Sequence, residues 1–378
     1  MNIIFFIGEM RGGGAEGVVA TLCNRLSERG HRITLVSHLK GQAYEISPTV
    51  NLVDVRTWQY DTYKGSYPVR IYKKAANRFL DYINIHRLFK QEAPQVIITF
   101  LSGWLWQLIL LCGKHIPLVC AERNAMVYPH GRNNFITKCV LYRMAYMVQV
   151  MSKYDKAWCR GRYKRVVPMP NPLRFTPLST AKFEELFPKR KNILACGRLV
   201  PQKGFDKLIQ AFAMIADKYP SWDVDICGED PAYSNYSKEI KRMISVNKLE
   251  GRIHFLGFHK NLDEIMQVHS IFSLSSQHEG FPNVLSEAMA NGLACVSFDI
   301  VTGPSEIIVD GLDGVIVEDQ NVEALAEGLS KLMGNEELRY SLGKKAIEDI
   351  QRFNTDKVVS KWEDLFNNVI KEYYHGKN

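Results

Sequence analysis

The chain has 378 residues, of which 46% are hydrophobic and 23% are charged. This length is too great for one ordinary hydrophobic core and suits two domains, and the composition excludes a largely disordered chain. Residues 1–175 hold 25 Lys and Arg against 10 Asp and Glu, whereas residues 176–378 hold 23 against 30. The basic first half suits an acidic partner such as phospholipid headgroups or a pyrophosphate, and we expect no nucleic-acid partner.

Three features that could indicate other classes of protein have plainer interpretations. The eight cysteines form no CxxC pair and no Cys/His cluster, which favours reduced thiols in a cytosolic protein over a zinc site or a disulfide framework. The uncharged stretch 96–113 is nearly as long as a membrane span, but Ser102-Gly103 divides it into a strand and a helix. The apolar start has no basic segment before it and is followed by glycines, so we interpret it as a first strand.

Strand-like segments alternate with amphipathic helix-like segments from one end of the chain to the other. In the first half we expect a helix at 15–30 and strands at 2–8, 31–38, 95–100, 117–122 and 146–152. In the second half we expect strands at 191–199, 223–230, 252–258, 271–276, 294–299 and 314–318. This alternation predicts an α/β fold with parallel sheets covered by helices.

A proline-rich segment near mid-chain separates the two series. Residues 168–177 contain four prolines, which is typical of a stiff, extended connection. We therefore expect an N-terminal domain at 1–170 and a C-terminal domain at 171–354. The amphipathic stretch 355–378 is long enough to pack back on the first domain as well as the second.

The segment HEGFPNVLSEAMANG, residues 278–292, is the most informative part of the sequence. We expect Glu279 after the carboxyl end of a strand, Pro282 in a first helical turn and Glu287 about one turn inside the helix. Two carboxylates there can hold sugar or ribose hydroxyls, while the amides at the helix start face a diphosphate. Each glutamate alone could equally be an ordinary helix carboxylate. The glycine-rich turn 8–14 could also cradle phosphate, although such turns need glycine in any case.

Taken together, these segments resemble glycosyltransferase family 4, the retaining enzymes with two Rossmann-like domains facing across a cleft (GT-B). The resemblance covers nearly the whole chain. It rests on GGGAE, the NP of the linker, CGRLVPQKGFDKLIQAF, ICGED, FLGF, EGFPNVLSE, GPSEII and DGLDGVIV, in that order. It implies transfer of a sugar from a nucleotide diphosphate to an acceptor with no cofactor. Retention in this family is usually described as front-face substitution, in which no dedicated nucleophile is required.

The resemblance also implies roles for individual residues. Arg198 and Lys203 match the basic pair that holds the donor diphosphate, where negative charge develops as the glycosidic bond breaks. Glu279 matches the carboxylate near the transferred sugar, and Glu287 the one that binds the ribose hydroxyls. The other donor contacts implied are Gly13, Gly14, Gly257, Phe258, Gly280, Phe281, Pro282, Asn283 and Val284.

The sequence Asp223-Val224-Asp225 looks like the Asp-x-Asp metal motif of other glycosyltransferases. It lies just ahead of ICGED, and we interpret it as the start of a strand. We therefore expect no metal ion, with Arg198 and Lys203 in its place.

Residues 63–90 form a basic and aromatic segment whose spacing allows cations to share one helical face. A solvated surface helix and a helix that binds a membrane surface or a pyrophosphate both remain open. Similar helices occur in bacterial transferases that extend polyprenyl-diphosphate-linked sugars, and those relatives also keep an ERN segment near the acceptor cleft. The acceptor contacts expected on this basis are Arg70, Lys73, Lys74, Arg78, Glu122 and Arg123. One departure is Gly17, where such relatives commonly carry arginine.

The function expected from the resemblance is transfer of a hexose or N-acetylhexosamine from a UDP-sugar, with UDP-Gal or UDP-GalNAc favoured. The expected acceptor is a polyprenyl-diphosphate-linked saccharide in bacterial surface polysaccharide (O-antigen-like) synthesis. The enzyme would lie in the cytoplasm, against the anionic inner leaflet of the inner membrane. The alternatives are a nucleotide-sugar 2-epimerase of the same architecture and a non-catalytic sugar- or lipid-binding scaffold. A NAD-dependent dehydrogenase is disfavoured because the turn GEMRGGG lacks the GxGxxG spacing.

Overall fold

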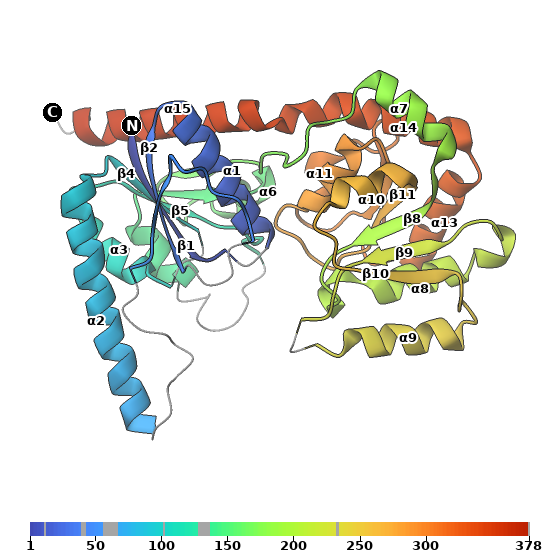
Figure 1. Cartoon of the computed structure of the whole chain (residues 1–378), viewed down its shortest axis with the longest axis horizontal. Helices are drawn as coiled ribbons and strands as arrows, with labels where there is room; N and C mark the ends of the chain where they lie inside the picture. Colours follow the sequence, from blue (N-terminus) through green and yellow to red (C-terminus); the bar gives the residue numbers. More distant parts are fainter. Residues whose placement is uncertain are drawn as a thin grey trace. The chain divides into compact units, whose positions relative to one another are not determined.

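The computed structural model describes residues 1–10, 13–38, 43–55, 67–100, 103–127, 137–231 and 234–376. Contacts divide the chain into two compact units (Figure 1). Unit 1 comprises Met1–Met151, Asp155–Pro172 and Thr355–Asn378, and unit 2 comprises Ser152–Tyr154 and Leu173–Asn354. Each unit is an α/β domain built on a parallel sheet, which confirms the expected fold class.

Unit 1 contains a seven-stranded sheet in the order β3-β2-β1-β4-β5-β6-β7, in which every pairing is parallel. Its strands are β1 (Asn2–Glu9), β2 (Arg32–His38), β3 (Asn51–Val53), β4 (Val96–Phe100), β5 (Leu118–Ala121), β6 (Met147–Val150) and β7 (Val166–Pro168). Its helices are α1 (Gly14–Glu28), α2 (Tyr67–Glu92), α3 (Leu105–Cys112), the π-helical turn η2 (Thr137–Leu141), α5 (Tyr142–Met144), α15 (Thr355–His375) and most of α6 (Lys153–Trp158), whose first two residues belong to unit 2. The short strands β3 and β7 were not expected from the sequence.

The central strand β1 is buried on both faces because helices cover both sides of the sheet. Phe5 faces a cluster built with α1 and α15, where the rings of Phe5 and Phe366 meet edge-on with centroids 6.1 Å apart. Phe6 faces the opposite cluster, formed with α2 and α3, and meets Trp104 at 5.8 Å. This alternation explains why β1 is apolar from Ile3 to Ile7.

The uncharged stretch 96–113 is divided between β4 and α3, as expected. Among the helices that the structure describes, none combines the length and apolar character needed to cross a membrane.

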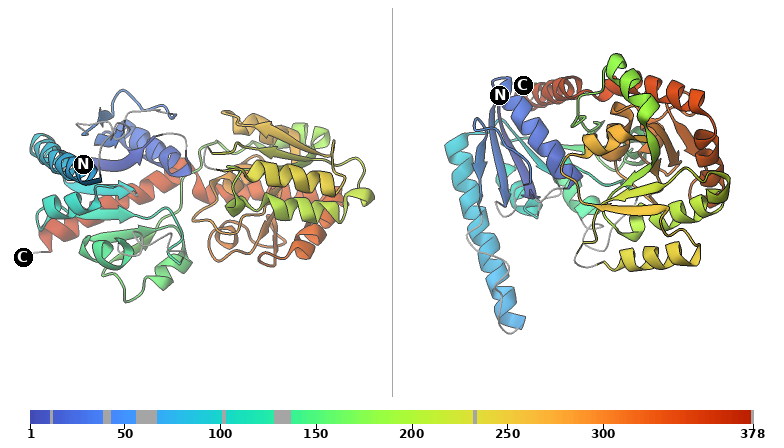
Figure 2. Two further views of the ribbon diagram at one scale, coloured as in Figure 1. Left: turned by 90° about the horizontal axis from the view of Figure 1, so that it is seen from below. Right: turned by 45° about the vertical axis from the view of Figure 1, so that its right-hand side comes forward.

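Unit 2 contains a six-stranded parallel sheet in the order β10-β9-β8-β11-β12-β13. Its strands are β8 (Lys191–Cys196), β9 (Val224–Cys227), β10 (Ile253–Gly257), β11 (His269–Leu274), β12 (Ala294–Phe298) and β13 (Val315–Val317). Its helical segments are α7 (Thr180–Leu186), η3 (Phe187–Lys189), η4 (Pro201–Lys203), α8 (Phe205–Ala213), η5 (Ala216–Lys218), α9 (Tyr236–Val246), α10 (Leu262–Val268), α11 (Asn283–Ala290), α12 (Pro304–Ile307), α13 (Val322–Met333), α14 (Glu336–Asp349) and η6 (Ile350–Phe353). Figure 2 shows helices on both faces of this sheet.

The strand order of unit 2 reverses between β8 and β11. The helix after β8 is α8, which packs in one core cluster, whereas α11 follows β11 and packs in the cluster on the other face. The two connections therefore leave the carboxyl ends of these neighbouring strands toward opposite faces of the sheet. This place is the switch point of the sheet, and open α/β sheets bind ligands there.

Candidate functional site

A lysine and a glutamate meet at the carboxyl edge of the unit 2 sheet. Lys203 ends η4, after β8, and Glu279 lies five residues beyond the end of β11. The Nζ of Lys203 is 2.6 Å from Oε1 of Glu279, and the hydroxyl of Ser276 donates to the same oxygen at 2.8 Å. Both charged side chains are largely buried, with 16% of Lys203 and 11% of Glu279 exposed. This is a strong, charge-assisted contact between the two loops at the switch point.

Backbone contacts fix these two loops against each other. Gly204 has a φ of +61°, and a Cβ at this position would lie 2.0 Å from the carbonyl oxygen of Ser275. The amide of Gln277 donates to the carbonyl of Gln202 at 2.8 Å, and the Ser275 hydroxyl donates to the carbonyl of Lys203 at 3.0 Å. Only glycine satisfies both the left-handed conformation and the close approach at position 204.

Helix α11 places the second glutamate. The helix begins at Asn283, with Pro282 in the preceding capping position, one residue earlier than the expected place in the first turn. Glu287 is the fifth residue of the helix, about one turn inside it, as expected, and is 1% exposed. Its Oε1 accepts a hydrogen bond from Nε of Arg174 at 2.5 Å. Its Oε2 is buried and has no hydrogen-bond partner among the described residues.

Arg174 was not predicted from the sequence. It lies 113 residues before Glu287, in the proline-rich segment, and its side chain is 26% exposed. A single arginine in a proline-rich segment forms no motif that would predict a distant carboxylate partner. The pair is therefore visible only in the folded structure.

The other predicted donor residues are divided between the two units. Arg198 is exposed and lies two residues beyond the end of β8, and Phe258, 65% exposed, follows the end of β10. Gly257, the last residue of β10, has a φ of +72°.

Phe281 packs edge-on against Phe353 with ring centroids 5.5 Å apart, so its ring belongs to the unit 2 core. Gly13 caps α1 in unit 1, and Gly14 is the first residue of that helix.

Asp223 and Asp225 lie at the amino end of the sheet, at the opposite edge from Lys203. Strand β9 begins at Val224, which agrees with the interpretation of this motif as a strand start. Asp223 pairs with Arg252 at 2.9 Å, and Asp225 pairs with Nε2 of His269 at 2.8 Å. Burial raises the pKa of Asp225. Hydrogen bonds, chiefly from His269, outweigh this effect, so the pKa lies below its ordinary value. Both aspartates are thus engaged with cationic or imidazole partners.

Glu122, one of the predicted acceptor contacts, lies inside unit 1 and is 1% exposed. Its Oε1 accepts the backbone amides of Arg123 and Asn124, each at 2.9 Å. Its Oε2 accepts the hydroxyl of Tyr142 at 3.1 Å and lies 3.7 Å from Nζ of Lys138. The carboxylate therefore stabilises the turn that follows β5.

Arg123 is also buried, with 9% exposed. Its guanidinium donates to Oδ1 of Asn171 at 2.6 Å and to Oε1 of Gln149 at 2.5 Å, and lies 4.6 Å from the centroid of the Phe100 ring. Burial lowers the pKa of Arg123 to about 9, so the side chain stays charged at neutral pH. Asn171 belongs to the linker, so Arg123 anchors the last part of unit 1 before the chain enters unit 2.

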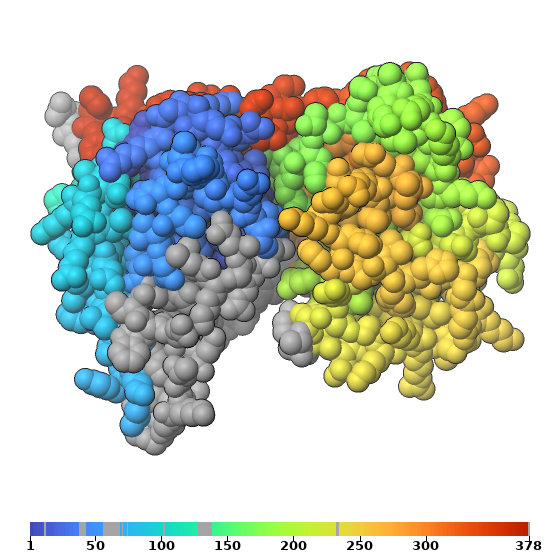
Figure 3. Space-filling view, in the orientation of Figure 1, coloured from blue at the N-terminus to red at the C-terminus, as the bar shows by residue number. Residues whose placement is uncertain are grey.

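Helix α2 carries the predicted basic segment on the outside of unit 1 (Figure 3). Tyr72 is 74% exposed and Phe79 is 63% exposed; their seven-residue spacing places them on one side of the helix. Asn77 and Asp81 are buried on the other side. Lys73 and Arg78 are also exposed. The side chains of Arg70 and Lys74 lie outside the described part of the structure.

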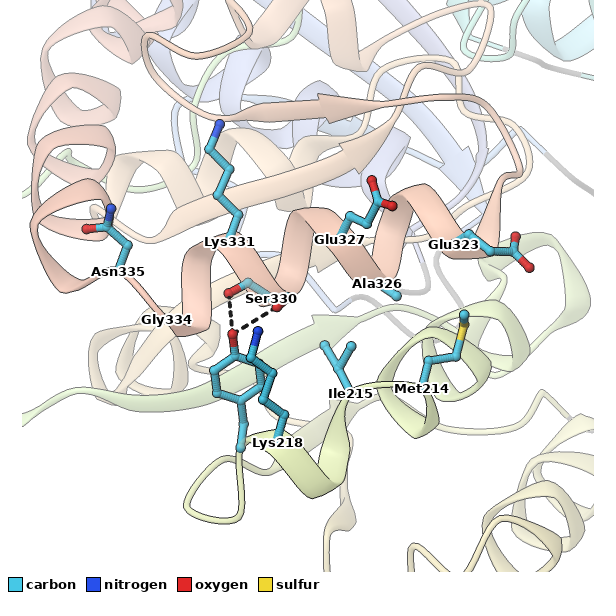
Figure 4. A pocket seen from close by; sticks show the side chains of 11 residues that line it. Met214, Ile215, Lys218, Glu323, Ala326, Glu327, Ser330, Lys331, Gly334 and Asn335 are labelled. Carbon is cyan, nitrogen blue, oxygen red and sulfur yellow. Dashed lines mark hydrogen bonds between the residues drawn. The ribbon is translucent and has the colours of Figure 1, made fainter.

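An open groove of about 640 Å³ lies elsewhere in unit 2, between the segment around η5 and helix α13 (Figure 4). The hydroxyl of Tyr219 bonds to the backbone and side-chain oxygens of Ser330 at 2.9 and 2.8 Å. None of the predicted site residues lines this groove, so it is separate from the loops at the switch point.

Two family models match the chain in succession. The model described as Glycosyltransferase Family 4 matches residues 12–173, and the one described as Glycosyl transferases group 1 matches residues 179–349. The chain therefore belongs to glycosyltransferase family 4 and has the GT-B fold.

Curated relatives are similar to the chain over different lengths. The amylovoran biosynthesis glycosyltransferase AmsD of Erwinia amylovora is 26% identical over 97% of this chain and 99% of its own length. A Campylobacter jejuni GalNAc-alpha-(1->4)-GalNAc-alpha-(1->3)-diNAcBac-PP-undecaprenol alpha-1,4-N-acetyl-D-galactosaminyltransferase is 25% identical over 98% of this chain and 99% of its own. The exopolysaccharide phosphotransferase SCO2592 of Streptomyces coelicolor is 37% identical, but the match spans 58% of this chain and 23% of that protein.

Among solved structures, Anabaena Alr3699/HepE in complex with UDP and glucose has a TM-score of 0.78. It is 19% identical to this chain and the match covers 97% of this chain and 99% of that one. At this identity the likeness supports the fold.

Proposed function

We propose that this glycosyltransferase takes a hexose or N-acetylhexosamine from a UDP-sugar, with UDP-Gal or UDP-GalNAc favoured. The proposed acceptor is a polyprenyl-diphosphate-linked saccharide in bacterial surface polysaccharide synthesis, and the anomeric configuration is retained. The observation that carries the proposal is the contact between Lys203 and Glu279 at the switch point of unit 2, with Glu287 on the adjoining helix. The names of full-length relatives, which include a GalNAc transferase acting on an undecaprenyl-diphosphate saccharide, support the choice of substrates.

Lys203 and Arg198 are the proposed ligands of the donor diphosphate. Two cations at the carboxyl edge, next to the start of α11, would offset the charge that develops on the leaving nucleotide. In the structure Lys203 is paired with Glu279. A bound diphosphate would replace one anionic partner of the ammonium with another. The proposal assigns no metal to the site.

Glu287 and Glu279 are the proposed ligands of the carbohydrate groups. The buried Oε2 of Glu287 accepts hydrogen bonds, and a ribose hydroxyl supplies the matching donor. Glu279 orients the transferred sugar and stabilises the positive charge that forms at its anomeric carbon. The donor C1–O bond breaks, the acceptor oxygen bonds to C1 on the same face, and the departing β-phosphate takes the acceptor hydroxyl's proton. The products are the nucleoside diphosphate and the extended saccharide.

Helix α2 is the proposed contact with the anionic cytoplasmic surface of the inner membrane. Tyr72 and Phe79 expose aromatic rings on one side of the helix, and Lys73 and Arg78 add exposed positive charge. Aromatic rings suit the headgroup region, and each cation near an anionic surface contributes roughly 1 kcal/mol of binding. Glu122 and Arg123 stay predicted acceptor residues, although only 1% and 9% of them are exposed in this structure.

Hydrolysis of a panel of UDP-sugars in the presence of EDTA tests the donor proposal. We expect one donor, UDP-Gal or UDP-GalNAc, to release UDP with EDTA present and to transfer its sugar with retention when a polyprenyl-diphosphate-linked saccharide is added. Activity that requires manganese would contradict the roles of Arg198 and Lys203. Conversion of a UDP-sugar to its 2-epimer without an acceptor would favour the epimerase, and binding without turnover would favour the scaffold.

A further inference from the structure

Arg174 forms an ion pair with the buried carboxylate of Glu287. The distance from its Nε to Oε1 is 2.5 Å, and Glu287 is 1% exposed. A carboxylate in such surroundings needs a charged or hydrogen-bonding partner, because removal from water penalises its charge strongly. Arg174 is the only cation paired with Glu287 among the contacts of the described residues.

The backbone around Arg174 is fixed to the same part of unit 2 as α11. Leu173 is 2% exposed, and its amide donates to the carbonyl of Phe353 at 3.0 Å. Phe175 packs against the core cluster that contains α11, and the guanidinium lies 5.8 Å from its ring centroid. The amide of Leu178 donates to the carbonyl of Ala290, the last residue of α11, at 2.9 Å. Contacts within unit 2 therefore hold the segment that carries Arg174 in place.

The two carboxylate oxygens of Glu287 differ in their hydrogen bonding. Oε1 accepts a hydrogen bond from Arg174, whereas Oε2 is buried without a hydrogen-bond partner among the described residues. An unpaired buried acceptor is costly, and a donor from a ligand would remove that cost. By binding one oxygen, the arginine determines which oxygen remains for the ligand.

We propose that Arg174 is a positioning residue for nucleotide recognition. It holds the Glu287 carboxylate so that Oε2 accepts a ribose hydroxyl, and it acts on the nucleotide only through Glu287. This inference rests on the proposed function, in which Glu287 binds the ribose of a UDP-sugar.

The test compares calorimetric binding of UDP and 2′,3′-dideoxy-UDP to the full chain. We expect the wild type to bind UDP roughly ten- to a hundredfold more tightly than the dideoxy nucleotide, because a hydrogen bond to a charged group is lost. In Arg174→Met the ratio should fall toward one, mainly through weaker UDP binding. Arg174→Lys should keep an intermediate ratio, and it provides a second variant if the methionine variant does not fold.

Two further variants separate positioning from general damage. Arg252→Met removes another arginine–carboxylate pair of unit 2, at the opposite edge of the sheet, and should keep the wild-type ratio. In a Glu287→Gln background, Arg174→Met should have little further effect on the ratio, because the two residues act together.

The outcomes distinguish this inference from the proposed function. If Arg174→Met and Arg174→Lys both keep the wild-type ratio, the positioning role is overturned while Glu287 keeps its ribose contact. If the wild type binds UDP but does not discriminate between the two nucleotides, the ribose contact fails and the positioning role fails with it. If the wild type does not bind UDP, the proposed donor class is wrong.

Discussion

Lys203 and Glu279 form an ion pair between the loops that follow β8 and β11, with 2.6 Å between Nζ and Oε1. This pair joins the two loops at the carboxyl edge of the unit 2 sheet. The proposed diphosphate then takes the place of Glu279 as the partner of the ammonium. The contact gives Lys203 a fixed position, and fixed charges are the most effective at stabilising a transition state.

The first prediction concerns this ammonium. Lys203→Ala should lower kcat for sugar transfer roughly a hundred- to a thousandfold, as removal of one fixed donor to a developing anion typically does. The matched control is Lys182→Ala, an exposed lysine of α7 paired with Glu185 on the surface of unit 2. The control should keep wild-type kcat. A kcat for Lys203→Ala within twofold of wild type would contradict the role given to this residue.

The second prediction concerns the backbone beneath the pair. Gly204→Ala adds a Cβ that would lie 2.0 Å from the Ser275 carbonyl oxygen, and φ is +61°. We expect losses of both stability and activity, because the loop that carries Lys203 must shift. Gly251→Ala is the control: its φ is +79°, but the added Cβ meets nothing within 4 Å. The control should lose only the roughly 1–2 kcal/mol of a left-handed alanine, measured by urea unfolding. Equal losses in the two variants would show that the close contact with Ser275 does not matter.

The third prediction concerns pH and the C-terminal helix. Glu363 of α15 lies 2.6 Å from Nε2 of His31 and 2.9 Å from Arg29. The hydrogen bond from His31 lowers the pKa of Glu363 below its ordinary value of 4.5; burial opposes this change and Arg29 adds to it. A folded-state pKa below the unfolded value means that the carboxylate contributes stability above the unfolded pKa. This stability is lost as the pH falls through the lowered pKa.

Glu363→Gln should therefore destabilise unit 1 by roughly 1–2 kcal/mol at neutral pH, since charge-assisted hydrogen bonds are weakened. The difference from wild type should shrink as the pH falls through the lowered pKa of Glu363, because the wild-type carboxylate then becomes protonated. Thermal unfolding measured from neutral to acidic pH checks this. A difference that stays constant over the range would show that the ionised carboxylate is not responsible.

The fourth prediction concerns α2. The double variant Tyr72→Ser/Phe79→Ser should bind anionic phospholipid vesicles markedly less than wild type in a sedimentation assay, because two exposed rings are removed. Val246→Ser, which removes a 72% exposed apolar side chain of α9 in unit 2, is the control and should bind normally. If the double variant binds the vesicles as well as wild type does, α2 is a solvated helix.

Much of the fold follows from sequence periodicity, because fully buried parallel strands are continuous apolar runs between amphipathic helices. The run NIIFFIG predicts β1, and β1 extends from Asn2 to Glu9. The short strands β3 and β7 have too few residues for a periodic pattern. Strand β7 also ends on Pro168, in a segment whose prolines indicate a connection. In such segments tertiary contacts decide the structure, and local propensity does not.

The candidate site was less predictable than the fold. The spacing of Glu279 and Glu287 correctly indicates a carboxylate before the helix and another inside it. The sequence does not indicate that Glu287 is paired with Arg174, because this pair forms only when the linker packs beside α11. The sequence also cannot distinguish a buried Glu122 from an exposed one. In the fold the amides of Arg123 and Asn124 donate to its carboxylate and satisfy it in its buried position.

A crystal structure of the enzyme with an intact UDP-sugar tests the central claim most directly. We predict that the diphosphate contacts Arg198 and Lys203, that a ribose hydroxyl donates to Oε2 of Glu287, and that the sugar lies against Glu279. A nucleotide bound to unit 1, away from these residues, would contradict these assignments.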